Sequence, residues 1–483
     1  IFNYNKMSNP SLIHRSNANS SLFNTIKARN SKRNQFNYVE EGEANICPTA
    51  RSRIVINPTT TLASGGNQTI KFELVNFGML EELYLQTSFL QGGTNADGSN
   101  DVFLVDQAGI FCMTRCRIVY NGNTIAELTP EQILATLYTR ANAERVAQLD
   151  AMTGGMPVGA AAAVGSLEGR RLLASAFGGQ TLSCPLGFWF SESLGRAWDL
   201  YSLSARAYVE VDYRANADLH SVNDSTACLY SEAKLVAYIS ELAPEELVAY
   251  QSSNYSPNSV SSQISFTTTQ FSDSIASPVL ITASSTAGNK VKIQSISGLV
   301  RRIFLFATLD SDRASTSAKE YNKSVDIASW KLMANNQVIY ENQHSAVGVD
   351  TASLSAGTGY NTDTYIEMVR NNLPMASGKS SDSLTSDTFK LFDVAVDKSL
   401  GAVGGGGLHP AHIKVINFGY NPQSLADADG CLSFSQLSVP EIECKWPTGT
   451  SAAVTLHVIA EVLTLNTYNT SANGQINYKL ITE

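Results

Sequence analysis

The feature that most constrains the fold is an internal repeat between the two halves of the chain. A glycine followed by two charged residues between apolar flanks occurs at residues 78–85 and again at 298–305. Three further matches follow in the same order: 118–125 with 332–339, 188–191 and the run around Val211 with 432–435 and 441–444, and 234–239 with 456–462. Four matches in one order indicate two copies of one fold.

Short alternating runs of strand-forming residues recur along both halves. They lie at residues 69–74, 83–87, 117–120, 208–213, 291–296, 303–308 and 455–465. Clusters of Gly, Asn, Asp and Ser separate them, and Asn121-Gly122 is a strong hairpin signal. Many short strands between turn signals predict an all-β protein built from sandwiches or barrels.

One segment has helical spacing instead. Thr129 can cap its N-terminus, Pro130 suits the first helical position and Gln132 can complete a capping box. The apolar face of this helix would comprise Ile133, Leu134, Leu137, Tyr138 and Ala141. We expect a packing element that ends by residue 154.

The chain divides into four expected regions. Residues 1–50 form a basic arm whose first 39 residues contain no Asp or Glu and whose cations include Arg15, Lys27, Arg29, Lys32 and Arg33. The arm is either a solvated terminus or a segment that binds neighbouring proteins or an anionic surface. Residues 51–243 form the first copy, the Pro- and Ser-containing residues 244–262 a linker, and residues 263–483 the second copy.

Charge and cysteine content restrict the setting. A net charge of -9 argues against a general nucleic-acid coat, and no strand interleaves aromatic and basic residues for sequence-specific RNA binding. No apolar run reaches the roughly 18 residues of a membrane helix, and the polar first residues do not resemble a secretory leader. The 7 scattered cysteines predict free thiols and a reducing compartment such as the cytoplasm.

The sequence contains partial matches to catalytic and cofactor-binding motifs, and each lacks residues that the motif requires. The segment 377–380 resembles a phosphate loop but lacks the earlier glycine and the strand-to-helix context. His409 with His412, and Cys112 with Cys116, have loose metal spacing but no second pair nearby. We therefore expect no catalytic, cofactor or metal site, and no enzyme activity.

Two motifs carry a resemblance to a known family. Pro185, Leu186, Phe188, Trp189 and Phe190 fit the "P-L-x-F-W-F" segment of the double jelly-roll major capsid proteins of nucleocytoplasmic large DNA viruses and their relatives, including virophages and polinton-like viruses. Residues 430–435, with Gly430 and Phe434, match the family's "G-x-L-x-F-S" segment. The chain resembles this family over residues 54–478, although its final segment, 466–478, lacks the family's Leu-Arg-Ile and second Gly.

The resemblance implies an all-β chain of two tandem eight-stranded jelly rolls with a few short helices in loops. It implies a major capsid protein, or a minor double jelly-roll capsid protein, located in the virion. Its partners would be two further copies in a homotrimer, neighbouring capsomers, minor, cement and penton proteins, and an internal membrane contacted through the arm. No cofactor and no sequence-specific nucleic acid are expected.

Two groups of residues receive specific interpretations. Strand alternation would direct Phe188 and Phe190 to one face and Trp189 to the other, so that one set fills the first core. Glu81-Glu82 and Arg301-Arg302 occupy equivalent places with opposite charge. They are either solvated strand ends or partners across a capsomer interface.

Two other function classes remain as alternatives. A β-sandwich carbohydrate-binding or adhesive module would need an exposed aromatic platform, and the four tryptophans are dispersed. A cupin-like enzyme would need a cluster of His and Glu on adjacent strands, which the sequence does not contain.

Overall fold

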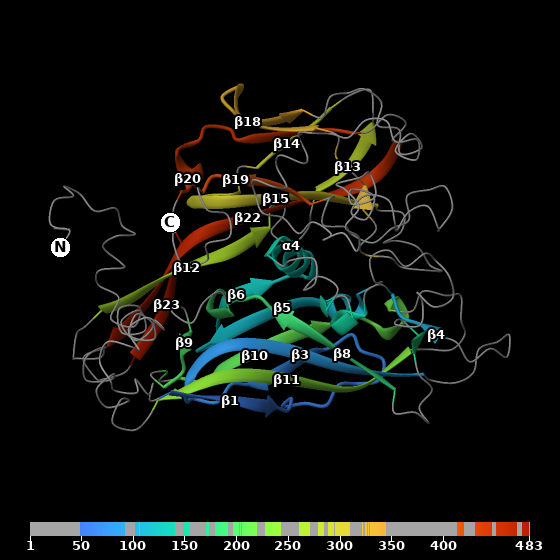
Figure 1. Ribbon diagram of the computed structural model, residues 1–483, viewed down its shortest axis with the longest axis vertical. Helices are drawn as coiled ribbons and strands as arrows, with labels where there is room; N and C mark the ends of the chain where they lie inside the picture. Colours follow the sequence, from blue (N-terminus) through green and yellow to red (C-terminus); the bar gives the residue numbers. More distant parts are fainter. Residues whose placement is uncertain are drawn as a thin grey trace, which may run out of the picture.

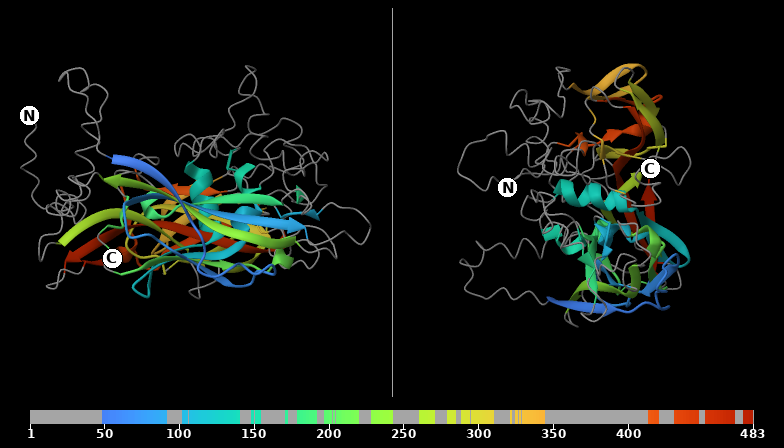
Figure 2. Two further views of the ribbon diagram at one scale, coloured as in Figure 1. Left: turned by 90° about the horizontal axis from the view of Figure 1, so that it is seen from below. Right: turned by 90° about the vertical axis from the view of Figure 1, so that its right-hand side faces the viewer.

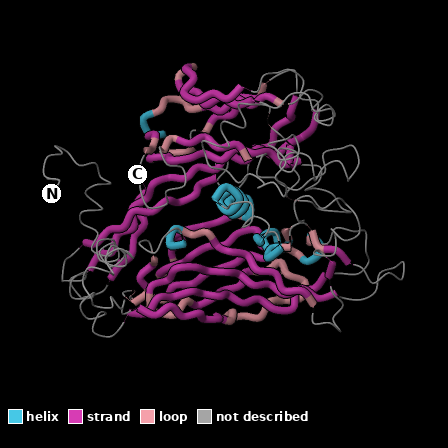
Figure 3. Tube along the Cα trace, viewed as in Figure 1, coloured by secondary structure: helices cyan, strands magenta, loops and turns pink. Residues whose placement is uncertain are grey.

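The computed structural model describes residues in ranges between 49 and 482 (Figure 1). Strands account for most of this part, and helical segments are few (Figure 3). The described residues are 49–91, 102–105, 107–140, 148–149, 151–154, 171–172, 179–191, 197–201, 203, 205–219, 228–242, 260–270, 279–284, 288–293, 295–309, 321, 324–325, 327, 329–343, 413–419, 430–446, 451–470 and 476–482.

Eight strands of the first half form two antiparallel sheets. The β3 sheet has the order β1-β11-β3-β8, and the β5 sheet has the order β2-β10-β5-β6. Counted along the chain, these orders are 1-8-3-6 and 2-7-4-5, which is the arrangement of a jelly roll. The strands are β1 (Thr49–Ile56), β2 (Thr69–Glu73), β3 (Met79–Gln91), β5 (Met113–Tyr120), β6 (Asn123–Leu128), β8 (Gln180–Leu186), β10 (Ala207–Tyr213) and β11 (Cys228–Leu242).

The second half repeats this arrangement. The β15 sheet contains β12, β22, β15 and β19 in the places of β1, β11, β3 and β8, and the β17 sheet has the order β14-β21-β17-β18. The strands are β12 (Val260–Gln270), β14 (Asn289–Lys292), β15 (Leu299–Leu309), β17 (Ser329–Ala334), β18 (Gln337–Gln343), β19 (Lys414–Asn417), β21 (Glu441–Lys445) and β22 (Ser451–Thr470). The predicted double jelly roll is therefore confirmed.

Short elements complete both halves. β9 (Trp198–Asp199) and β20 (Leu432–Ser433) pair with the starts of β3 and β15 respectively. The remaining elements are β4 (Val102–Phe103), β7 (Arg171–Leu172), β13 (Val279–Ser284), β16 (Ser324–Val325), β23 (Ile476–Thr482), the helices α3 (Ala108–Phe111) and α4 (Pro130–Arg140), and the 3₁₀-helices η4 (Trp189–Ser191), η6 (Asn216–Asp218) and η10 (Phe434–Gln436).

The internal repeat extends to backbone detail. Gly78 and Gly298 precede β3 and β15 with φ of 83° and 84°, a region open to glycine. The pairing register with β11 skips Glu81, and the register with β22 skips Arg301, which is the pattern of a β-bulge. The two copies therefore match residue by residue around these positions.

The hairpins that join β5 to β6 and β17 to β18 are also equivalent. Asn121, Gly122, Asn335 and Asn336 all have positive φ. A two-residue type I′ hairpin turn requires this at both of its central residues. Each hairpin has one register shift on the same side of its turn. The predicted match of residues 118–125 with 332–339 is therefore confirmed.

One predicted match is wrong. Leu432 and Ser433 pair with the start of β15 as Trp198 and Asp199 pair with the start of β3. The backbone amides of Leu200 and Phe434 donate to the carbonyls of Gly78 and Gly298, at 3.0 Å and 2.9 Å. The counterpart of residues 432–434 is therefore 198–200 rather than part of 188–191. The prediction was wrong because similar runs of aromatic residues and serine occur in elements that are not equivalent.

Helix α4 begins as expected. The amide of Thr129 donates to Oε1 of Gln132 at 2.8 Å, and the amide of Gln132 donates to Oγ1 of Thr129 at 3.4 Å, which makes a capping box. Ile133 and Leu134 of the predicted apolar face are buried and belong to the core of the first jelly roll. The helix lies between the two jelly rolls (Figure 1; Figure 2, right).

The two jelly rolls share an apolar contact. Phe304, Phe306 and Ile459 of the β15 sheet belong to the same buried cluster as the core of the first jelly roll, whereas Ile303 and Leu305 belong to the second core. Tyr321 of the second half stacks on Phe111 at 5.5 Å and lies 4.2 Å from the guanidinium carbon of Arg214. The β15 sheet is therefore covered on both faces.

Candidate functional site: packing motifs and contact surfaces

The described residues contain no sign of a reactive centre. Within them, no three His, Cys, Asp or Glu side chains lie close enough together to hold a metal ion. Burial raises the pKa of the Cys112, Cys228 and Cys444 thiols to about 12, and it raises the pKa of Cys116 further. These thiols stay protonated near neutral pH and are poor nucleophiles and metal ligands.

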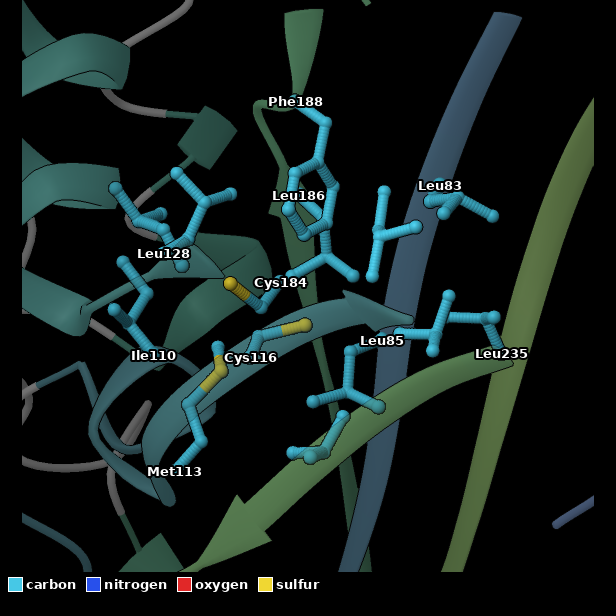
Figure 4. Packing of buried hydrophobic residues seen from close by; sticks show 14 of the residues in the cluster. Leu83, Leu85, Ile110, Met113, Cys116, Leu128, Cys184, Leu186, Phe188 and Leu235 are labelled. Atoms are coloured by element: carbon cyan, nitrogen blue, oxygen red, sulfur yellow. The ribbon is translucent and has the colours of Figure 1, made fainter. Parts of the chain in front are cut away.

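The described part of the chain also lacks any helix that is long and apolar enough to span a membrane. Six cysteines of this part are free, and five of them are buried. Figure 4 shows Cys116 of β5 and Cys184 of β8 among leucines of the first core. The loose Cys112–Cys116 spacing is thus explained by core packing.

The "P-L-x-F-W-F" segment builds an aromatic cluster at the end of β8. Phe188 follows the strand, and Trp189 and Phe190 lie in η4, so the predicted alternation of these three side chains is wrong. All three are buried, and Trp189 and Phe190 contact Trp198 with ring centroids 5.5 Å and 6.1 Å apart. Because the chain leaves the strand and turns into a 3₁₀-helix here, these side chains do not alternate between two faces as they would in a strand.

The two earlier residues of this motif belong to β8. Leu186 is buried in the core, and Pro185 lies opposite Tyr84 on the other face of the sheet. Proline is tolerated here because β8 is the last strand of its sheet and pairs only on one side. The motif therefore has a packing role.

The second motif has a similar role. Phe434 is buried and contacts Phe418, with ring centroids 6.2 Å apart. A Cβ atom at Gly430 would meet the carbonyl oxygen of Phe418 and lie 2.9 Å from Cα of Gly419. Only glycine permits this close backbone approach.

All four tryptophans are buried. Their exposed fractions are 3% for Trp189, 0% for Trp198, 1% for Trp330 and 3% for Trp446. The tryptophans therefore do not form the exposed platform that a carbohydrate-binding module needs.

Glu81 and Glu82 are bound within the chain. Arg51 of β1 reaches both, with Nε 2.9 Å from Glu81 and Nη2 2.9 Å from Glu82. Ser240 also donates to Glu81, and the hydroxyl of Tyr84 donates to Glu82 at 2.8 Å. The Glu82 side chain remains 37% exposed, so the predicted contact with another chain stays a prediction for this residue.

Arg301 and Arg302 are neither solvated strand ends nor exposed contact residues. Their exposed fractions are 0% and 2%. Arg302 forms a two-point ion pair with Glu461 of β22, with Nε–Oε2 and Nη2–Oε1 distances of 2.7 Å and 2.8 Å. The prediction of a contact across an interface is wrong for Arg302, because its carboxylate partner belongs to the same sheet.

Sequence reasoning missed a row of charges that crosses each of the other two sheets. In the β5 sheet the order across the strands is Lys71, Glu210, Arg117, Glu127, and in the β17 sheet it is Lys290, Glu443, Lys331, Glu341. Lys71 lies 2.7 Å from Glu210, and Lys331 lies 2.6 Å from Glu341. Opposite charges on neighbouring strands stabilise a solvated sheet face.

The basic residues assigned to the arm, Arg15, Lys27, Arg29, Lys32 and Arg33, lie outside the described residues.

Comparison with known proteins rests on the fold. No protein-family model matches the chain, and no curated protein matches it in sequence. Among solved structures, it is similar to the VP54 protein of the virus PBCV-1 fitted into a reconstruction of the virophage Sputnik, with a TM-score of 0.56 and 12% identity over 92% of this chain and 100% of that chain. It is also similar to the Faustovirus major capsid protein, with a TM-score of 0.55 and 11% identity over 90% of this chain and 93% of that chain.

A chain in the structure of the Sputnik virophage itself gives a TM-score of 0.50 and 12% identity over 90% of this chain and 88% of that chain. These matches span both halves, and the strand order of each half is that of a jelly roll. The chain therefore has the double jelly-roll fold of these viral capsid proteins.

Proposed function

We propose that this chain is a viral major capsid protein that forms homotrimeric capsomers and tiles an icosahedral shell. The observation that carries the proposal is the pairing of two jelly rolls of one strand order in one chain, in a fold shared with the Faustovirus major capsid protein. Fold likeness alone is compatible with several functions, and the contact between the two halves of the chain narrows them.

The contact within the chain supplies a pattern for contacts between chains. The outward face of the β15 sheet, the face turned away from its own core, packs against the first jelly roll. The equivalent outward face of the β3 sheet carries the half-buried residues Tyr84, Gln86 and Ser183. We assign this face to contact with the second jelly roll of the next copy.

Such a contact joins different surfaces of two copies and closes into a ring when the rotation is right. Three chains would then place six jelly rolls around one axis, with a pseudo-hexagonal outline that can tile a shell. Many modest contacts in such a lattice add to a stable whole.

The remaining partners follow from charge. The basic arm would face an anionic inner surface, where each Lys or Arg contributes about 1 kcal/mol. Neighbouring capsomers and minor, cement and penton proteins would meet the outer edges of the trimer. Free buried thiols fit assembly in the reducing cytoplasm of a host cell before incorporation into the virion. In this role the chain is not an enzyme.

Native mass by light scattering tests the proposal. The expected result is a stable species near three times 52.0 kDa, whereas a monomer that binds glycans would overturn it in favour of a sandwich binding module. A trimer that occurs in only a few copies per virion would indicate a minor double jelly-roll capsid protein.

A pair of variants tests the assigned contact face. Gln86→Arg places a long cation on the outward face of the β3 sheet and should reduce the trimer fraction. Asn123→Arg, at an exposed hairpin position, should leave the trimer intact. Equal trimer fractions in the two variants would contradict the assignment of this face.

A further inference from the structure

A row of four side chains crosses the outward face of the β3 sheet from one edge to the other. Val55 of β1 lies opposite Val236 of β11, and Val236 lies opposite Tyr84 of β3. Tyr84 in turn lies opposite Pro185 of β8. The only polar atom of these four side chains is the Tyr84 hydroxyl, which donates to Glu82 at 2.8 Å. We call this set the Tyr84 row.

The Tyr84 row lies outside both cores. Val236 is only 2% exposed, yet it belongs to neither core cluster. Val55 is 42% exposed, and Tyr84 and Pro185 are half-buried. β1, β3 and β11 lie on the side of the first jelly roll away from the second (Figure 1). The row therefore presents apolar surface on a side that the chain's own second jelly roll does not reach.

Polar residues flank the Tyr84 row on both sides. The neighbouring positions toward the start of β3 are Arg53, Tyr238 and Glu82, and those toward its end are Lys234, Gln86 and Ser183. An apolar centre between polar margins is the usual anatomy of a protein–protein interface.

The second jelly roll shows what covers the equivalent row. Ile459, Phe304 and Val415 occupy the places of Val236, Tyr84 and Pro185 in the pairing registers. All three are buried in the cluster that they share with the first jelly roll. This row is apolar in both copies of the fold, and in the second copy a jelly roll covers it.

The next position along the strand differs between the copies. Phe306 is buried in the shared cluster, whereas its counterpart Gln86 is partly exposed and donates to Oγ of Ser183 at 3.3 Å. The apolar part common to both outward faces is therefore the row itself. A partner of the β3 sheet would have a narrower apolar contact than the one within the chain.

The aromatic rings beside the row are already held in place. The Tyr84 and Tyr238 ring centroids lie 5.8 Å apart at 77°, and the guanidinium carbon of Arg51 lies 4.8 Å from the Tyr238 ring centroid. Rings that are fixed before binding lose little conformational entropy on binding, and Tyr and Arg are enriched among residues that dominate binding energy. Two rings at 77° do not form the flat aromatic platform of a carbohydrate-binding module.

We propose that the Tyr84 row is the apolar centre of the contact between copies, and that the second jelly roll of the next copy covers it. The inference rests on the proposed trimer and adds which residues of the β3 face hold it together. Gln86 and Ser183 then belong to the polar margin of the contact.

Three variants test the row. Val55→Ser and Tyr84→Ala each remove apolar surface from it, and Val338→Ser makes the same exchange as Val55→Ser at a valine of β18 that is 48% exposed. Thr124 occupies the place of Val338 in the first jelly roll and remains exposed beside the second, so the equivalent contact should leave Val338 uncovered. Sedimentation velocity over a concentration series measures trimer formation, and urea denaturation measures the stability of the unassembled chain.

The expected losses differ by variant. Tyr84→Ala should weaken each contact between chains about 30-fold, and Val55→Ser about fivefold. Val338→Ser should leave association unchanged. Both serine variants should keep the stability of the unassembled chain, because both valines are exposed within it.

Tyr84→Phe separates loss of contact from loss of fold. It keeps the ring and removes only the hydroxyl that donates to Glu82, so it should form trimers nearly as well as the unchanged chain. Association as weak as that of Tyr84→Ala would show that the hydroxyl rather than the apolar row matters, and would overturn the proposal.

The remaining outcomes distinguish this inference from the proposed function. A trimer that Val55→Ser and Tyr84→Ala weaken no more than Val338→Ser does would overturn the role of the row and leave the capsomer proposal standing. Lower stability of the unassembled Val55→Ser chain with unchanged association would show that a segment of the same chain covers the row, and would also overturn it. An unchanged chain that stays monomeric at every concentration would overturn the proposed function, and this inference with it.

Discussion

The outward faces of the β3 and β15 sheets occupy equivalent places in the two jelly rolls but differ in chemistry. Tyr84 and Gln86 on β3 correspond to Phe304 and Phe306 on β15, as their pairing registers show. On the neighbouring strands, Pro185 opposite Tyr84 corresponds to Val415 opposite Phe304. At Tyr84 and Gln86 the β3 face carries polar groups and is partly exposed, whereas at Phe304 and Phe306 the β15 face is apolar and covered by the first jelly roll.

The inward faces, by contrast, are alike. Leu83 and Leu85 correspond to Ile303 and Leu305, and all four are buried. On β3 and β15 the inward face is therefore apolar in both jelly rolls, whereas the outward face differs with what covers it. In a duplicated fold, the more apolar outward face is therefore the one covered by the other jelly roll of the same chain.

Exchanging the equivalent residues Phe306 and Gln86 should have the largest effect on the free energy of unfolding. Phe306→Gln removes a fully buried ring that stacks on His457 at 4.7 Å, and it buries an amide in its place. We expect a loss of about 3–5 kcal/mol in the free energy of unfolding, measured by urea denaturation. The reverse exchange, Gln86→Phe, should change the free energy of unfolding of the unassembled chain by less than about 0.5 kcal/mol, because this face is partly exposed within one chain. Similar losses in both variants would contradict the difference between the faces.

The two glycines that precede the equivalent strands should respond alike. Gly78→Ala and Gly298→Ala each place a side chain at a φ near 84°, which costs roughly 1–2 kcal/mol. At Gly78 the added Cβ also meets the side chain of Ile239. Thermal melting should show a loss in both variants. A tolerated alanine at either position would contradict the equivalence of the two strand starts.

Acid should affect the two jelly rolls differently. Burial acts to raise the pKa of Asp212, but hydrogen bonds from Thr69 and Arg115 and the charge of Arg117 outweigh it, so this pKa lies below its ordinary value of 3.8. The ionised group therefore stabilises the fold fully above its ordinary pKa of 3.8, and the contribution is lost as pH falls from that value through the lower pKa of the folded state. The equivalent position in the second jelly roll is Lys445, a residue of opposite charge.

Asp212→Asn should therefore lower the melting temperature slightly at pH 7 and have a smaller effect at pH 3. Each such partly exposed ion pair contributes roughly 0.2–1 kcal/mol. Lys445→Gln provides the control and should show no such convergence at low pH. An equal loss for Asp212→Asn at both pH values would refute the assigned role of its charge.

The smallest expected effect concerns the two hairpin turns. Asn336 has a φ of 60° where the first jelly roll has Gly122. Asn336→Gly should raise the free energy of unfolding by a few tenths of a kcal/mol, because glycine adopts this conformation without steric cost. Gly122→Asn should lower it by a similar amount, as a Cβ atom there has open space and only the backbone resists. Thermal melting of the two variants checks the opposite signs.

The sequence predicts features that depend on neighbours along the chain. The hairpin at Asn121-Gly122 and the cap of α4 formed by Thr129 and Gln132 are both confirmed. Local backbone chemistry decides these features, so a few adjacent residues suffice. The internal repeat was also visible, because equivalent strands need the same glycine and the same inward pattern.

Features that depend on distant partners were mispredicted. Two arginines at a strand start, Arg301 and Arg302, resemble a solvated strand end. Burial of Arg302 costs desolvation free energy, which the ion pair with Glu461 offsets, and Glu461 lies 159 residues away along the chain. Phe188, Trp189 and Phe190 resemble an alternating strand, but β8 ends at Leu186 and a 3₁₀-helix follows. Local patterns do not indicate which face a second jelly roll covers.

The central claim is that one chain supplies two of six jelly rolls in a closed capsomer. Electron cryomicroscopy of the purified chain tests it most directly. The account predicts a trimer with a pseudo-hexagonal outline, in which the outward face of the β3 sheet is covered by the second jelly roll of the next copy. A particle in which this face stays open to solvent, or one with fewer than three chains, would contradict it.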